Sequence, residues 1–319
     1  MAYLANIRAM FQLLAGKPGL GIEITSSEIR LAAVARRRAN LFALAVKTFE
    51  LPSGLVSGNY ASPNIRDLDE FSAVLRDCLA GIPMPGIRRA ALSLPDGVFR
   101  VQTIDFDELP AQAADRERLI RWRIEKAAAI DAVDTVLRYQ ILKGQDKGFT
   151  VLACVIKQAV HAQYEAALVG AGLEPWSVGP SSFYSLNFFS PFITGKTAVS
   201  ALAHITEDSF ATIIVEADGA RFYRYKEVKG AGAGEGKARF MREIDDSLHF
   251  YTHMDRTQRS EVKGLYLTGE TGLPSDLAEG LKSLTSLEVQ VLSPAAVIPS
   301  ANGAGPDMAA ALGAGCSLL

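Results

Sequence analysis

The amino-acid sequence predicts a duplicated two-lobe α/β fold with an α+β subdomain inserted into the first lobe. Each half of the chain begins with strand-like segments around a polar turn, at residues 20–35 and again at 199–225. Alternating helix and strand patterns follow both hairpins, as is typical of layered α/β proteins. Residues 88–172 have their own succession of strands and helices, which could bury one face of a small sheet, and this predicts the insertion.

The individual elements follow from hydrophobic periodicity. Apolar alternation in GIEI and IRLAAVA, on either side of a polar turn, predicts the first hairpin, and a third strand is expected at 41–51. Residues 67–81 predict a helix, because an acidic start precedes apolar residues at helical spacing and Gly81 follows them. In the insertion we expect strands at 90–95, 98–106, 135–142 and 149–156 and helices at 112–129 and 160–173.

The second half predicts a lobe of the same kind. A helix-rich stretch to about residue 192 leads into the second hairpin, and a flexible Gly/Ala segment follows at 229–237. The remaining expected elements are helices at 238–254, 275–284 and 307–318, strands at 264–269 and 288–292, and a Pro/Ala/Gly loop at 293–305.

Composition excludes several classes of protein. With 319 residues, 49% of them hydrophobic and 21% charged, the chain can bury a large core, and a net charge of -2 gives no field that would attract nucleic acid. Cys78, Cys154 and Cys316 have no metal-ligand spacing and indicate a reducing compartment, where they act as small buried hydrophobic residues. Residues 175–195 are broken by prolines and fail as a membrane-spanning helix, so we expect a soluble cytoplasmic protein.

The first 17 residues predict a short amphipathic helix without secretory-signal character. Its apolar face is Tyr3, Leu4, Ile7, Met10, Phe11 and Leu14. Docking on the protein's own surface, a shallow membrane contact and binding to a partner all fit this pattern. We favour docking, because one Arg and one Lys give little of the basic face that membrane-surface helices use.

Polar residues in the first turn could bind phosphate. The turn contains Glu23, Thr25, Ser26 and Ser27, and hydroxyl and backbone N–H groups converge in such turns. An ordinary polar hairpin turn is the commoner explanation of this pattern taken alone.

The order of motifs along the chain resembles the PilM family of type IV pilus assembly, within the actin/Hsp70/sugar-kinase superfamily. The motifs that carry the resemblance are GIEITSSEIRLA, the second hairpin, EIDDSLHFY at 243–251 and LYLTGETG at 265–272. It extends through LPSGLVSGN, RRAALSLP, IRWRIEKAAAI, LVGAGLEP and the terminal DMAAALGAGCSL, and so covers nearly the whole chain.

The resemblance implies an actin-like, ribonuclease H-like duplicated fold and a division into domains. The implied parts are an N-terminal segment 1–17, a lobe-one core of 18–87 and 173–198, an inserted subdomain 88–172 and lobe two 199–319. The resemblance also implies a cytoplasmic scaffold that binds the tail of a PilN-like single-pass inner-membrane protein. The tail would lie as an extended peptide in a groove between the lobe-one core and the insertion. Membrane association would then be indirect, with the assembly platform and its motor ATPases as further partners.

The nucleotide site implied by the family is degenerate in this chain. Glu23 replaces the family's Asp and Thr25 replaces a Gly, and in the second hairpin His204, Ile205 and Thr206 stand where the family has Asp-Ile-Gly. These changes remove Mg²⁺ and water ligands, so we predict no meaningful ATPase activity. The residues left for a weakly bound ATP or ADP are Glu23, Thr25, Ser26, Ser27, Glu243, Gly269 and Gly272.

Two other functional classes stay open at this point. One is an active nucleotide hydrolase or kinase of the superfamily, against which the missing acid at His204 speaks. The other is the cytoplasmic domain of a GspL-type secretion platform protein, which usually continues into a membrane span.

Three smaller features have competing explanations. His249 and His253 share one helical face, but the third ligand of a metal site is missing. Residues 36–38, three consecutive arginines, form either a solvated hairpin tip, the commoner case, or a contact with anionic lipid. On the helix at 112–129, Trp122 is expected to pack on the sheet, while an Arg-rich face containing Arg121 either is solvated or borders the partner groove.

Overall fold

The computed structural model describes residues 18–82, 86–131, 133–143, 148–193, 199–216, 219–228, 235–253, 261–269, 275–301 and 303–319. The chain forms two compact units, each described by itself below. Unit one contains residues 1–95, 160–189 and 293–319, and unit two contains residues 96–159 and 190–292. The predicted N-terminal helix lies outside the described residues.

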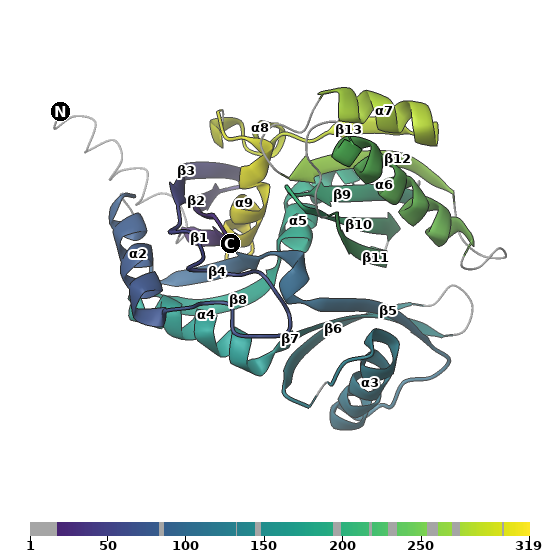
Figure 1. The fold of residues 1–319 in the computed structure, drawn as a ribbon, viewed down its shortest axis with the longest axis horizontal. Coiled ribbons are helices and arrows are strands. Elements are labelled where there is room, and N and C mark those ends of the chain that lie inside the picture. Colours follow the sequence, from purple (N-terminus) through teal and green to yellow (C-terminus); the bar gives the residue numbers. More distant parts are fainter. Residues whose placement is uncertain are drawn as a thin grey trace. The chain divides into compact units, whose positions relative to one another are not determined.

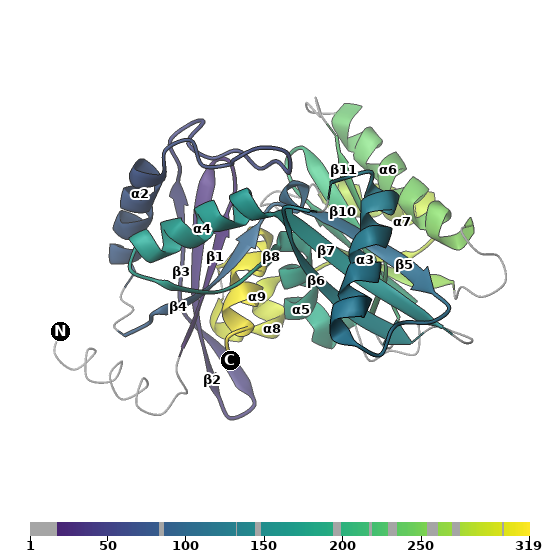
Figure 2. The same cartoon turned by 90° about the horizontal axis from the view of Figure 1, so that it is seen from below.

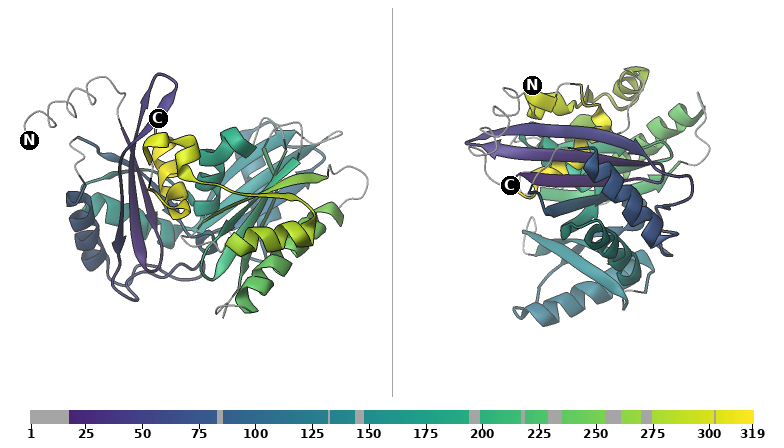
Figure 3. Two further views of the ribbon diagram at one scale, coloured as in Figure 1. Left: turned by 90° about the horizontal axis from the view of Figure 1, so that it is seen from above. Right: turned by 90° about the vertical axis from the view of Figure 1, so that its left-hand side faces the viewer.

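Unit one is built on a five-stranded mixed sheet (Figure 1). Its strands, in spatial order, are β3 (Asn40–Glu50), β2 (Glu28–Arg37), β1 (Gly19–Ile24), β4 (Arg89–Leu94) and β8 (Glu174–Pro180). The first three are antiparallel, whereas β4 and β8 run parallel to β1. Helices α2 (Leu68–Ala80) and α9 (Ala309–Cys316) lie on opposite faces of this sheet (Figure 3).

Close packing of α9 on the sheet explains a glycine in β1. A Cβ atom at Gly21 would lie only 1.8 Å from the carbonyl oxygen of Ala311, so no larger residue fits there. Every residue of β1 is buried, and α9 is buried from Ala309 to Gly315. The terminal motif that carried part of the family resemblance is therefore a core helix of unit one.

Three further helices belong wholly or partly to unit one. Helix α4 (Gln158–Gly170) begins at the end of unit two, and α5 (Ser181–Ile193) begins in unit one directly after β8. A short helix, α8 (Pro294–Val297), and the 3₁₀ turns η2 (Pro299–Ala301) and η3 (Pro306–Met308) precede α9. The stretch at 293–305, expected to be a loop, is therefore partly helical.

Unit two contains a second sheet with the strand order and directions of the first. Its order is β11 (Gly219–Glu227), β10 (Ser209–Glu216), β9 (Val199–Ile205), β12 (Val262–Gly269) and β13 (Glu288–Val291). Again three antiparallel strands are followed by two that run parallel to the central one. Helices α6 (Glu235–His253) and α7 (Ser275–Thr285) pack on it through a core that includes Ile244, Tyr251 and Leu281. The predicted duplication is confirmed.

The insertion supplies a three-stranded antiparallel sheet covered by one helix (Figure 2). The strands are β5 (Arg100–Phe106), β7 (Phe149–Lys157) and β6 (Thr135–Lys143), with α3 (Ala113–Ala128) on one face and the turn η1 (Asp96–Val98) ahead of β5. The Tyr223 hydroxyl of β11 donates a hydrogen bond of 2.8 Å to Asp96, which ties the insertion to the second sheet within unit two. The domain boundaries drawn from the sequence stay a prediction.

Most elements agree with the sequence prediction, and β8 is the clearest omission. We expected a helix-rich stretch there, but residues 174–180 form a strand next to β4. Pro175 and Pro180 stand near its two ends, where prolines are tolerated in an edge strand.

Candidate functional site

The first hairpin turn closes on itself through Thr25. The backbone N–H groups of Glu28 and Ser27 donate to Thr25 Oγ1 at 2.9 Å and 3.3 Å, and the Thr25 N–H donates to the Glu28 carbonyl at 2.9 Å. Hydrogen bonds of this kind are typical of Thr and Ser in turns. Two backbone N–H groups of the turn, those of Ser27 and Glu28, are therefore already satisfied by a side chain.

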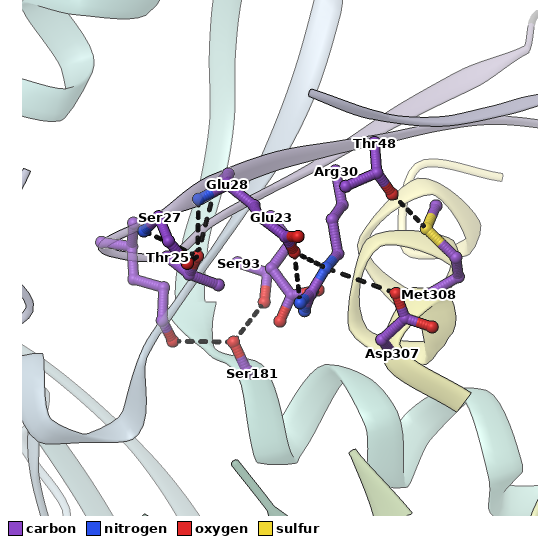
Figure 4. A network of polar contacts seen from close by, with 11 residues as sticks. Glu23, Thr25, Ser27, Glu28, Arg30, Thr48, Ser93, Ser181, Asp307 and Met308 are labelled. Carbon is purple, nitrogen blue, oxygen red and sulfur yellow. Dashed lines mark hydrogen bonds and ion pairs between the residues drawn. The ribbon is translucent and has the colours of Figure 1, made fainter. Parts of the chain in front are cut away.

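One arginine gathers three carboxylates beside this turn (Figure 4). Arg30 lies opposite Glu23 in the β1–β2 register, with 3.4 Å between Arg30 Nη1 and Glu23 Oε2. Its Nη2 lies 2.6 Å from Glu28 Oε2, and its Nε lies 3.6 Å from Asp307 Oδ2, in η3. Arg30 and Glu23 are both buried, so the guanidinium is the counter-ion that makes burial of the Glu23 charge tolerable.

Burial controls the protonation of Glu23. Loss of water raises the pKa of its carboxyl from 4.5 to about 7, although the Arg30 guanidinium and a hydrogen bond from Ser181 both act to lower it. Ser181 also makes hydrogen bonds of 2.8 Å with Ser93 and 3.0 Å with the Leu94 carbonyl. The carboxyl end of β1 is thus a closed polar network.

These residues do not fit a Mg²⁺-phosphate site. A magnesium ion needs carboxylate oxygens or waters in near-octahedral geometry, whereas the Glu23 carboxylate is held by a guanidinium. A phosphate needs free N–H groups, and those of Ser27 and Glu28 are bonded to Thr25. The assignment of Glu23, Thr25, Ser26 and Ser27 to a nucleotide stays a prediction, without support from this geometry.

The second hairpin repeats the turn but not the ion pair. The Thr206 N–H donates to the Ser209 carbonyl at 2.8 Å, and the Thr206 hydroxyl donates to the same oxygen at 3.1 Å. His204 precedes Thr206 by two residues, as Glu23 precedes Thr25, and it is buried opposite Ala211. The second half therefore keeps the backbone of the first and replaces its acid with an imidazole.

The predicted adenosine residues lie in unit two and have local partners. Gly269, at the end of β12, has a φ of +132°, and a Cβ atom there would lie 1.8 Å from the Ile205 carbonyl oxygen. Close approach of β12 to β9 therefore explains this glycine without a ligand. Glu243 on α6 forms an ion pair with Lys226 on β11, and Gly272 lies outside the described residues.

The predicted site residues are divided between the two units. Glu23, Thr25, Ser26 and Ser27 share one turn in unit one, while Glu243 and Gly269 belong to unit two. Sequence reasoning missed Arg30, although a charged residue within the apolar strand EIRLAAVA was a visible signal. The sequence gives no signal for Asp307, which the fold brings to Arg30 from the far end of the chain.

The helix α3 differs from its prediction in two ways. It packs on its sheet through Ile120 and Ile124, whereas Trp122 is 51% exposed, so the packing role expected for Trp122 is wrong. Arg121 is not a free surface charge, because its Nη1 donates to the carbonyl and hydroxyl oxygens of Thr135 on β6 at 3.2 Å and 2.9 Å. Arg121 therefore fastens the helix to its own sheet.

A second exposed tryptophan lies on an edge strand of unit one. Trp176 of β8 is 55% exposed, and the Arg89 guanidinium stacks over its ring at 4.3 Å. Arg89 Nε is also 3.5 Å from a Glu174 carboxylate oxygen. The sheet of unit one ends at β8, so the outward backbone groups of this strand have no strand partner in that sheet.

The described residues form neither a candidate metal site nor a candidate membrane-spanning helix. They contain no group of three or more His, Cys, Asp or Glu side chains that could hold a metal ion. None of the described helices is long and apolar enough to span a bilayer.

Comparison with solved structures identifies the fold. A chain described as part of the PilM–PilN type IV pilus biogenesis complex matches with a TM-score of 0.78 at 18% identity, over 94% of this chain and 98% of that one. A Bacteroides thetaiotaomicron protein with an actin-like ATPase fold matches with a TM-score of 0.53 at 14% identity, over 93% and 95%. The cytoplasmic domain of EpsL, an inner membrane component of the Vibrio cholerae type II secretion system, has a TM-score of 0.44 at 11% identity, over 80% of this chain and 83% of that one.

The chain therefore has the actin-like ATPase fold. No protein-family model matches it, and no curated protein matches it in sequence. At these identities the structural similarity shows the fold alone, and at that level it confirms the resemblance to the PilM family found in the sequence.

Proposed function

We propose that the chain is a scaffold of a type IV pilus inner-membrane assembly platform, where it binds the cytoplasmic tail of a PilN-like membrane protein. The observation that carries the proposal is the match to the PilM–PilN complex over 94% of this chain. The order of sequence motifs agrees with this similarity. The chain would be cytoplasmic and held at the inner membrane by its partner, and the rest of the platform and its motor ATPases are proposed as further contacts.

The chemistry of the first turn favours a scaffold over a hydrolase. Arg30 supplies an internal cation to Glu23, and Thr25 uses the N–H groups of Ser27 and Glu28, so this carboxylate and these two donors are already engaged. The second turn has His204 where an acid would orient water. Weak binding of ATP or ADP near Glu243 and Gly269 remains part of the proposal, and no hydrolysis is expected.

The edge strand β8 offers a specific place for the tail on the lobe-one side. An extended peptide can add to an exposed strand edge through main-chain hydrogen bonds, with side-chain pockets giving specificity. The half-exposed Trp176 ring, oriented by Arg89, would be the anchor, since Trp and Arg are enriched among residues that dominate binding energy. The proposal places the tail along β8, with an apolar side chain over Trp176.

Binding of a labelled tail peptide tests this proposal. The peptide is the N-terminal cytoplasmic segment of the PilN-like protein encoded beside this chain, and its affinity is measured by fluorescence anisotropy. We expect Trp176→Ala to weaken binding about ten-fold or more, as loss of an interface anchor does. Trp122→Ala is the matched control, because Trp122 is equally exposed but lies in unit two.

The outcomes of this titration test the proposed function and the proposed binding place of the tail separately. No binding by the wild-type chain would overturn the proposed function. If both tryptophan variants bind the peptide as tightly as wild type does, the proposed function stands and the tail does not lie along β8. Loss in Trp122→Ala alone would move the contact to the inserted subdomain.

A further inference from the structure

The tip of the β2–β3 hairpin carries three consecutive arginines. Strand β1 pairs with β2 only from Ile29 to Val34, so the last residues of β2 and the first of β3 extend past it, as Figure 2 also shows. Residues 36–38, which we call the arginine tip, are all exposed. The hairpin thus holds three guanidinium groups at the end of a two-stranded projection.

Positive charge is segregated on this hairpin. No acidic residue occurs between Ile29 and Phe49, while the whole chain has a net charge of -2. The two acidic residues of the hairpin, Glu28 and Glu50, lie opposite each other in the strand register, at the end of the hairpin away from the tip. The tip is therefore a local cationic site on a weakly acidic protein, and it favours an anionic surface.

Apolar side chains follow the arginines on β3. Leu41 and Phe42 are half-buried, and Leu44 is 45% exposed. Leu44 lies at an irregularity in the strand pairing, since Ala43 pairs with Val34 and Ala45 with Ala33, which leaves Leu44 without a partner on β2. Cations beside exposed apolar groups are the composition of protein surfaces that bind the membrane interface.

The backbone conformation at the tip is unusual for an arginine. Arg38 has a φ of +55° in the two-residue turn between Arg37 and Asn40. Glycine or asparagine is usual in that conformation, which costs other residues on the order of 1 kcal/mol. An arginine at this place keeps a third guanidinium at the end of the hairpin against the preference of the turn.

We propose that the arginine tip, with Leu44 behind it, contacts the anionic phospholipid headgroups of the membrane beneath which the scaffold works. Guanidinium groups bind phosphate oxygens in bidentate fashion, and Leu44, set back from the tip on β3, would add an apolar contact with the hairpin lying along the membrane surface. A nucleic acid would use the arginines but not the apolar residues, so the combination favours lipid. The contact goes beyond tail binding: the partner recruits the chain, and the tip adds a direct and weaker attachment.

Vesicle co-sedimentation at low ionic strength tests the inference. The probes are vesicles that contain phosphatidylglycerol and vesicles of phosphatidylcholine alone. Each arginine near an anionic surface strengthens binding about five-fold, so replacing residues 36–38 together by glutamine is expected to lower partitioning onto the anionic vesicles roughly 100-fold. Leu44→Ser is expected to weaken binding several-fold on its own.

A matched variant controls for net charge. Three exposed cations that are scattered along the chain are Arg66, Arg118 and Lys282. Their joint replacement by glutamine changes the net charge by the same amount as the tip variant does. This variant should keep most of the binding, and wild-type binding should fall steeply with added salt. Melting temperatures and tail-peptide affinities should be equal in the two triple variants, so that failure of the lipid contact and failure of the proposed function are distinguishable.

Three results would overturn the proposal. The first is no preference of the wild-type chain for anionic vesicles at low salt. The second is an equal loss in the tip variant and the scattered-charge variant, which would reduce the effect to net charge. The third is a full effect of the arginines with none from Leu44, together with equally strong binding to an RNA homopolymer, which would make the tip a general polyanion contact.

Discussion

Removal of Arg30 is the sharpest test of the closed network at the first turn. Arg30→Met keeps much of the side-chain volume and deletes the charge. Glu23 then loses its counter-ion while it stays buried, whereas Glu28 lies nearer the surface and regains water. Breaking a buried pair by removing one partner costs about 3 to 5 kcal/mol. We expect a loss at the lower end of this range near pH 8, because Glu23 escapes part of the cost by taking up a proton.

The assay is urea unfolding followed by tryptophan fluorescence. The chain has two tryptophans, and in a Trp122→Phe background the remaining one, Trp176, reports on the unit that contains Arg30. Adding Glu23→Gln to Arg30→Met should restore most of the lost stability, since the buried charge is then gone. Arg66→Met is the control, because its ion pair with Glu70 is exposed and should contribute less than about 1 kcal/mol.

Two results would refute this reasoning. A loss below about 1 kcal/mol in Arg30→Met at pH 8 would mean that the burial of Glu23 is tolerated without its cation. Failure of Glu23→Gln to rescue Arg30→Met would mean that the arginine acts through packing and not through its charge.

Four further predictions follow from the two lobes. Burial raises the pKa of Glu23 to about 7, so the native state binds this proton more tightly than the unfolded state. The bound proton therefore contributes to the free energy of unfolding in full below about pH 4.5, and this contribution is lost as pH rises through 7. Wild type should therefore lose about 3 kcal/mol relative to Glu23→Gln between these limits, and parallel urea curves at both ends would contradict it. Gly269→Ala should cost about 2 kcal/mol or more through its contact with β9 and its positive φ, while Gly264→Ala, where a Cβ atom has room, should be nearly neutral by thermal melting. Arg121→Glu should lower stability by about 1 to 2 kcal/mol, since it removes both hydrogen bonds to Thr135, and an unchanged melting temperature would restore the sequence-based view of a free surface charge. Wild type and Glu23→Gln should release phosphate from ATP at the same background rate, and a faster wild-type rate would show a working hydrolytic site.

The duplicated fold was predictable because its signals are local. Strand alternation around two polar turns, and helical spacing after them, gave both sheets, and Asp67 and Gly81 mark the observed ends of α2. Strand β8 was missed because prolines interrupt its pattern, and its pairing partner β4 lies about eighty residues earlier in the chain. Propensity cannot report such a partner.

The site was less predictable because its chemistry depends on burial and on distant partners. Arg121 and Trp122 are neighbours, and both differ from their predictions. Trp122 is exposed because Ile120 and Ile124 occupy the buried face of α3, whereas Arg121 is bonded to the sheet. A helix with apolar residues on more than one face leaves this choice open in the sequence. Glu23 was predicted to contact a nucleotide for the same reason, because only the fold shows the Arg30 guanidinium beside its carboxylate.

The two hairpins share a turn and differ in the polar groups beside it. Both keep a threonine that closes the turn, Thr25 and Thr206, in the same place relative to the strands. In the first lobe the acid persists, but Arg30 from the opposite strand neutralises it and ties it to the C-terminal region. In the second lobe His204 takes the place of the acid and is buried opposite Ala211. The first turn is thus closed by an ion pair and by hydrogen bonds of the chain itself, and the second turn keeps the hydrogen bonds with an imidazole in place of the acid.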